Sequence, residues 1–96
     1  MRLSATQKDV LFVLYGMQLR EMDRIVQGMQ LLALLNNNRG SDIHASNFRT
    51  SCNTLVEHGL LKRYRNSALK LAFSLTETGA ETGKKLYDER VAEFQD

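Results

Sequence analysis

The chain of 96 residues contains no proline, no tryptophan and a single cysteine, Cys52. One cysteine cannot form an internal disulfide, so a disulfide-stapled fold is excluded and a reducing compartment is favoured. No apolar run approaches the roughly 20 residues that a membrane-spanning helix needs. The first residues, MRLSATQK, lack the apolar segment of a signal peptide. We therefore expect a cytoplasmic protein without a membrane partner.

Nothing in the sequence marks a linker, because it has no proline, no repeat and no low-complexity tract. The length fits one domain over residues 1–96. A hydrophobic fraction of 43% with 25% charged residues is ordinary globular composition. A chain of this size buries only a modest core, so pairing with a second copy would add stability.

The net charge of +2 is unevenly distributed. Residues 1–43 carry five basic and four acidic side chains, net +1, and residues 77–96 carry three basic and six acidic, net −3. The middle, residues 44–76, has five basic side chains against one acidic, net +4. Such a basic stretch indicates a surface for a polyanion, although a solvated face can give the same count.

The first half of the chain predicts two helices and a loop. Ser4 and Gln7 form a capping-box pattern before a run with three- and four-residue apolar periodicity. A second helix is expected to be capped by Asp23, although one bent helix over both segments fits equally well. Its inner side would carry Ile25, Val26, Met29, Leu32 and Leu35. The sequence NNNRGSD at 36–42 is typical of a loop.

A third helix, capped by Ser46, is expected next, and Gly59 is expected to end it. Its apolar side would carry Phe48, Cys52, Leu55 and Val56. The rest of its surface would carry Asn47, Arg49, Thr50, Ser51, Asn53 and Thr54. Two strands over 60–65 and 69–76 follow, joined by residues 66–68. Their inner face would carry Leu69, Leu71, Phe73 and Leu75.

A C-terminal helix is expected within residues 78–96, from about Thr78 to Phe94. Its apolar stripe provides the candidate dimer contacts Leu86, Tyr87, Val91 and Phe94. Packing of this stripe onto the first helix is the alternative. We favour a symmetric homodimer, because twofold DNA-binding proteins place two recognition helices about one helical turn apart.

Three segments of the chain resemble winged helix-turn-helix transcription regulators of the MarR or PadR kind. They are LSATQKDVLFVL, NFRTSCNTLVEHGLLKRYR and FSLTETG. Leu55 to Leu60 match the Leu-x-x-x-Gly-Leu pattern at the exit of the recognition helix. Lys62 or Arg63 matches a basic residue of the first wing strand. The closing Leu-Thr-x-x-Gly pattern is matched by Leu75, Thr76 and Gly79.

This resemblance implies a mostly α fold with a small β-hairpin, ordered helix-helix-helix-strand-strand-helix, and double-stranded DNA as partner. The chain is shorter than typical MarR proteins, its loop before the third helix is longer, and its wing is short. We therefore expect the wing to lie on the DNA backbone without entering the minor groove deeply. A homodimeric repressor that covers a promoter is the favoured function.

The polar face of the third helix suits the major groove, where short polar side chains and arginine contact base edges. The candidates are Ser46, Asn47, Arg49, Thr50 and Asn53. Arg49 suits guanine, Asn47 or Asn53 suits adenine, and Ser46 and Thr50 suit phosphates. The wing would hold the backbone through Arg63, Arg65, Asn66 and Lys70. Simple solvation is the alternative, but solvated helices favour Glu and Lys over the Ser, Asn and Thr found here.

No pattern typical of catalysis or of a cofactor is present, so we expect no enzyme and no cofactor. His44, Cys52 and His58 lack the close spacing of metal ligands, so no metal site is expected. An oxidation-sensing Cys52 and a small-molecule effector site near Tyr15 and Met17 are possible but unsupported. Two other functions fit the same fold: a protein-binding winged helix without DNA, and a DNA-binding accessory protein in replication or partition of a mobile element.

Overall fold

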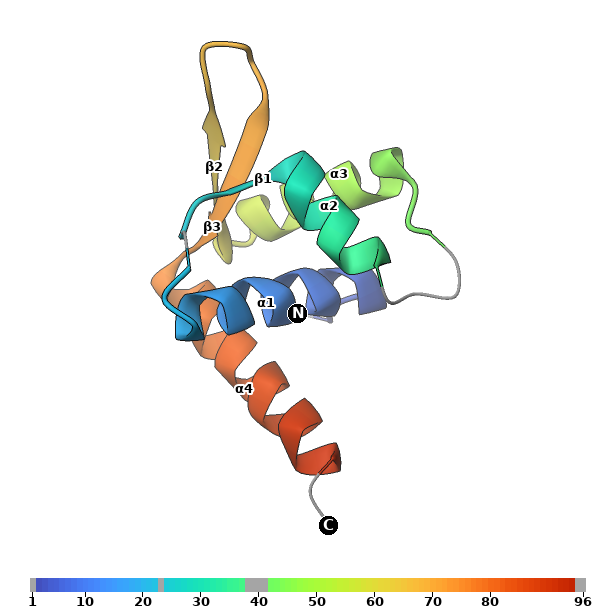
Figure 1. The fold of residues 1–96 in the computed structure, drawn as a ribbon, viewed down its shortest axis with the longest axis vertical. Coiled ribbons are helices and arrows are strands. Elements are labelled where there is room, and N and C mark those ends of the chain that lie inside the picture. The colour runs from blue at the N-terminus through green and yellow to red at the C-terminus, as the bar shows by residue number, and fades with distance from the viewer. Residues whose placement is uncertain (1, 23, 38–41, 95–96) are drawn as a thin grey trace.

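The computed structural model describes residues 2–22, 24–37 and 42–94 (Figure 1). Within these residues the chain forms four helices, α1 (Ala5–Leu19), α2 (Gly28–Asn36), α3 (Ala45–Glu57) and α4 (Glu77–Glu93). Three strands, β1 (Val26–Gln27), β2 (Leu61–Arg65) and β3 (Leu71–Leu75), form an antiparallel sheet in the order β1-β3-β2. The β2–β3 hairpin projects from one end of the helical body and α4 from the other (Figure 1).

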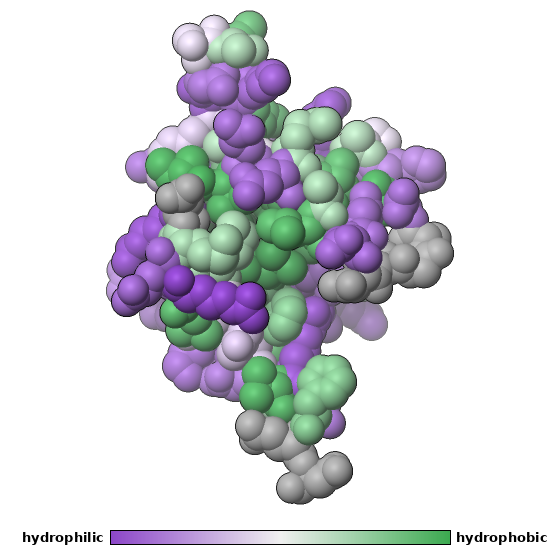
Figure 2. Space-filling model, viewed as in Figure 1, coloured by the Kyte–Doolittle hydropathy of each residue, from purple (hydrophilic) through white to green (hydrophobic). Residues whose placement is uncertain are grey.

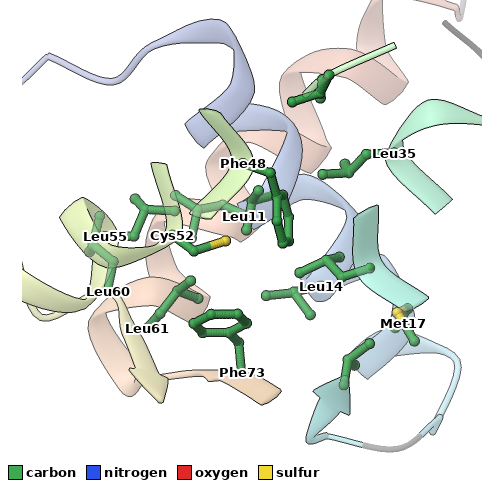
Figure 3. Packing of buried hydrophobic residues seen from close by; sticks show 14 residues of the cluster. Leu11, Leu14, Met17, Leu35, Phe48, Cys52, Leu55, Leu60, Leu61 and Phe73 are labelled. Atoms are coloured by element: carbon green, nitrogen blue, oxygen red, sulfur yellow. The ribbon is translucent and has the colours of Figure 1, made fainter. Parts of the chain in front are cut away.

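Helix α1 is the central support, since α2, α3, α4 and β3 all contact it. Its predicted capping box is confirmed: the Gln7 amide donates to Ser4 Oγ at 3.2 Å, and the Ser4 amide donates to Gln7 Oε1 at 2.9 Å. Leu11 and Leu14 of this helix meet Phe48 of α3 and Phe73 of β3 in the core (Figure 3). The two phenylalanine rings pack edge to face with centroids 6.5 Å apart.

The second helix begins later than predicted, and the single bent helix is wrong. Val26 and Gln27 are extended and pair with Phe73 and Ala72, so they form an additional strand. Tertiary packing decides this, because the β-branched Val26 fills a buried site beside Phe73. Ile25 and Asp23 were both expected in this helix: Ile25 lies before it and is half exposed, and Asp23 lies outside the described residues.

Met29 was also expected on the inner side of α2, but 76% of it is exposed, while Leu31 and Leu35 are buried. The buried positions of α2 are Gly28, Leu31 and Leu35, so its first two turns face the core one residue earlier than predicted. The arrangement leaves Met29 at the surface in the first turn.

Helix α3 starts at Ala45, with His44 and not Ser46 in the N-cap position. Asn36 explains the early start: its Oδ1 accepts from the Ile43 amide at 2.8 Å and its Nδ2 donates to the Ile43 carbonyl at 3.3 Å. Ile43 is thereby fixed in the core, and the helix follows directly. Ser51, expected on the surface, is buried because it lies three residues after Phe48, on the same side of the helix.

The end of α3 is joined to the start of α4. Gly59 has a φ of 77° and ends the helix as predicted, with the Leu60 amide donating to the Leu55 carbonyl at 2.9 Å. The Thr76 hydroxyl donates to the Gly59 carbonyl at 2.6 Å and accepts from the Gly79 amide at 3.0 Å. The Leu-x-x-x-Gly-Leu pattern, which ends at Leu60, and the Leu-Thr-x-x-Gly pattern, which begins at Leu75, are therefore in contact in the fold.

The hairpin differs from its prediction at the tip. Strands β2 and β3 pair with Arg63 opposite Phe73 and Arg65 opposite Leu71, and five residues, 66–70, connect them. Leu69 was expected on the inner face, but it has a φ of 60° and is 71% exposed. The chain bends there because Asn66 Oδ1 accepts from the amides of Ala68 and Lys70 at 2.9 and 3.0 Å.

Most of α4 packs on α1. Gly79 and Gly83 are buried, and Gly83 lies against Tyr15 and Leu11. Tyr87 stacks on Phe12 with ring centroids 5.5 Å apart and meets Tyr15 edge-on at 5.7 Å. Tyr87, a candidate dimer contact, therefore packs onto the first helix, as the alternative prediction stated.

The C-terminal part of α4 is held at its edge by one charged group. Arg90 donates to Asp9 Oδ1 at 2.8 Å and places its guanidinium 4.4 Å from the centre of the Phe12 ring. Phe94, beyond this contact, is 88% exposed. The end of the helix therefore carries apolar surface that the rest of the described chain leaves uncovered.

We predict that Gly79→Ala destabilises the fold, because an alanine Cβ there would overlap the carbonyl oxygen of Leu60. Neither backbone can move without breaking the link between Thr76 and Gly59, so the loss should reach about 3 kcal/mol. Gly28→Ala is the control, since its Cβ would make only ordinary contacts at 3.5 Å and should change stability by less than about 1 kcal/mol.

Thermal unfolding followed by circular dichroism distinguishes the two variants. The melting temperature of Gly79→Ala should fall by roughly 10 °C or more, and that of Gly28→Ala by far less. Equal melting temperatures for the two would contradict the packing described here.

Candidate nucleic-acid interface

Helix α3 presents the polar face that the sequence predicts. Ser46, Asn47, Arg49 and Thr50 are exposed, and Asn53 is half-buried. On the other side Phe48, Cys52 and Leu55 are buried and hold the helix in place. The Thr50 hydroxyl donates to the Ser46 carbonyl at 3.0 Å, so its proton is used within the helix and its oxygen remains an acceptor.

Asn53 and Arg63 connect the helix to the hairpin. Arg63 Nη1 donates to Asn53 Oδ1 at 3.0 Å. A bidentate contact with adenine needs both the oxygen and the nitrogen of an asparagine amide. Since the Asn53 oxygen is engaged by Arg63, this pair fixes the angle between α3 and the wing. Contacts of either residue with DNA remain predictions.

Three of the predicted cations border one groove of about 580 Å³ between α2, α3 and the wing. Arg49 comes from α3, and Arg65 and Lys70 come from the wing. The described residues that line the groove include no acidic side chain. The described part of the chain also provides no ion pair or side-chain hydrogen bond to these three groups. No described residue therefore compensates the positive charge beside the exposed face of α3.

Two exposed apolar residues that were not predicted as site residues, Met29 and Leu69, also line this groove. Figure 2 shows hydrophilic residues along the strands of the wing, pale and apolar residues at its tip, and an apolar patch where the wing meets the helical body. The signal for Leu69 was Asn66, whose side chain can bond the backbone two residues later and so turn the chain. For Met29 no sequence signal existed, because its exposure depends on where β1 ends.

Asn66 itself was predicted to contact DNA, and the structure gives it another task. Its side-chain oxygen accepts two amide protons of the turn, and its own amide donates to the Lys70 carbonyl at 3.1 Å. Among the described residues of the wing, none accepts a hydrogen bond from its side-chain nitrogen. Asn66 therefore shapes the tip that carries Lys70, and a direct contact with DNA stays a prediction.

Cys52 is completely buried in the core, and this burial raises the pKa of its thiol to about 12 from an ordinary value of 9.0. No group of three or more His, Cys, Asp or Glu side chains among the described residues is placed to hold a metal ion. Met17 is buried, and Tyr15 packs against Tyr87. These side chains serve the core, and an effector site near them remains a prediction.

We predict that Cys52 is unreactive in the folded protein. At pH 8 the raised pKa lowers its thiolate fraction by roughly a thousandfold, so reaction with a disulfide reagent such as DTNB should require unfolding. The neutral thiol stabilises the fold below pH 9, and this contribution is lost as the pH rises from 9 towards 12. Equal reaction rates in buffer and in denaturant would contradict the burial of this side chain.

No helix among the described residues is both long and apolar enough to cross a membrane. No family model and no curated protein sequence matches this chain. Solved structures do match. RosR of H. salinarum has a TM-score of 0.78 at 19% identity, covering 97% of this chain and 78% of RosR. F-93 of SSV1 has a TM-score of 0.73 at 18% identity, covering 99% of this chain and 96% of F-93.

A third similar structure is MepR, a transcription regulator of the Staphylococcus aureus multidrug efflux pump MepA. Its TM-score is 0.69 at 16% identity, covering 96% of this chain and 63% of MepR. At these identities the likeness concerns the fold. The predicted architecture is confirmed: the chain has a winged helix-turn-helix fold, with α3 in the recognition position and β2–β3 as the wing.

Proposed function

We propose that this protein is a sequence-specific, double-stranded DNA-binding transcription regulator, acting as a homodimeric repressor. The observation that carries the proposal is the set of uncompensated cations, Arg49, Arg65 and Lys70, beside the exposed polar face of α3. A duplex provides closely spaced phosphates for such a surface and a major groove that admits one helix.

In this arrangement α3 enters the major groove and the wing follows the backbone. Arg49 is the guanine contact, and Asn47 and Ser46 lie on the same exposed face. Arg63, Arg65 and Lys70 bind phosphates and fix the position of the helix without contacting bases. Arg63 serves this purpose well because its bond to Asn53 holds the wing at a set angle to α3.

The second copy would bind through the end of α4. Of the predicted dimer contacts, Tyr87 already stacks on Phe12, and Leu86 packs against the core. Val91 and Phe94 remain available, and they lie at the end of the molecule opposite the wing (Figure 1). In a dimer joined through this end of α4, the basic surface of each copy would lie away from the acidic C-terminal segments.

Repression is part of the proposal, because a dimer that covers a promoter would exclude polymerase from the same DNA. MepR, of the same fold, is a transcription regulator, which supports a regulatory role. A protein that binds chromosomal or mobile DNA in this way acts in the cytoplasm.

We predict that two arginine variants differ in their effect on DNA binding, measured by fluorescence titration with labelled duplex. Arg49→Ala should relax the sequence preference, because it removes a base contact. Arg63→Ala should lower the affinity for all duplex sequences alike and reduce the dependence of affinity on salt, because it removes a phosphate contact. Lys85→Ala, at an exposed cation of α4, is the matched control and should leave binding unchanged. Absence of duplex binding at low salt would refute the proposed function.

We also predict that Phe94→Asp dissociates the homodimer without unfolding the protomer, because this side chain is 88% exposed. Sedimentation velocity should show a dimer for the wild type and a monomer for the variant, and circular dichroism should show the same helix content for both. Duplex affinity should fall together with dimer formation. A wild type that sediments as a monomer would contradict the role of α4.

A further inference from the structure

The tip of the wing contains an exposed apolar residue in a backbone conformation that suits glycine. Leu69 has a φ of 60° and exposes 71% of its surface. A side chain with a Cβ is disfavoured in this left-handed region. Because the Asn66 amide bonds to the Lys70 carbonyl, residues 67–69 form the loop of this hairpin, and three-residue loops usually place glycine at the last position. The leucine is therefore not explained by the demands of the turn.

The turn forces this conformation on Leu69 through its neighbours. The Leu69 amide donates to the Asn66 carbonyl at 2.9 Å, and the Asn66 amide donates to the Lys70 carbonyl at 3.1 Å. The Asn66 side chain closes the same loop by accepting from Ala68 and Lys70. Leu69 contributes only its backbone to this network, so glycine would fit the wing better and leucine adds nothing to the core.

The position of the side chain indicates what it contacts. Leu69 lines the groove that Arg49 borders from α3, so it lies on the side of the wing that faces the recognition helix. Arg65 and Lys70, both proposed to bind phosphates, border the same groove. An apolar group placed among phosphate-binding cations meets the deoxyribose rings and base edges that lie between the phosphates.

We propose that Leu69 makes a shallow apolar contact with the minor groove that flanks the segment bound by α3. This inference rests on the proposed function and adds a contact to it. Apolar side chains that press into the minor groove partly unstack a base step, and pyrimidine–purine steps yield most easily. Leu69 thus favours duplexes with a flexible step at this flank. This shallow contact is added to the expected position of the wing on the DNA backbone.

The test is Leu69→Gly, because it relieves the backbone and removes the apolar group at the same time. We expect an equal or higher melting temperature and a duplex affinity that is lower by roughly three- to tenfold. The dependence of affinity on salt should stay unchanged, since no phosphate contact is lost. Lys70→Ala is the contrast: its salt slope should fall by about one.

A second variant, Leu69→Asn, keeps a side chain of similar size and accepts the left-handed conformation. It should lose affinity as Leu69→Gly does, because it is polar. Wild-type affinity in both variants would overturn the leucine contact and leave the proposed function intact. A lower melting temperature of Leu69→Gly would also overturn it, since Leu69 would then be structural. A wild type that binds no duplex would refute both.

Discussion

The Thr76 hydroxyl holds the structure together at the point where three elements meet. It donates to the Gly59 carbonyl at the exit of α3 and accepts from the Gly79 amide at the start of α4. The Thr76 amide also donates to the Leu60 carbonyl, which closes the base of the wing. Helix α3, the wing and α4 therefore share one junction, and their relative directions are set together.

This junction separates two surfaces of opposite character. On one side, α3 and the wing carry the basic residues, and Arg63 bonded to Asn53 braces them against each other. On the other, α4 carries the acidic C-terminal segment and ends in the exposed Phe94. Helix α1 supports both through its core residues and through the stacking of Phe12 on Tyr87. The proposed DNA surface and the proposed pairing surface therefore lie on different elements.

Local sequence patterns predicted those features of the fold that depend on interactions between residues close in the chain. The Ser4 capping box, the helix end at Gly59 and the apolar side of α3 were all predicted, because each depends on residues a few positions apart. Strand β1 was missed, since two residues form it only where Phe73, distant in sequence, pairs with them. Leu69 was misplaced because one side-chain oxygen of Asn66 bends the wing tip. In the candidate site, the polar face of α3 could be predicted from the sequence. The hydrogen bond between Asn53 and Arg63 could not, because only the fold brings the two residues together.

Two copies of the basic surface are proposed to recognise one twofold-symmetric DNA site. Selection of bound duplexes from a random pool with the 96-residue chain is the direct test. We expect an enriched palindrome whose half-sites are separated by about one helical turn, roughly 10 base pairs. Enrichment of a single, asymmetric half-site would contradict the homodimer, and recovery of no preferred sequence would contradict specific recognition by α3.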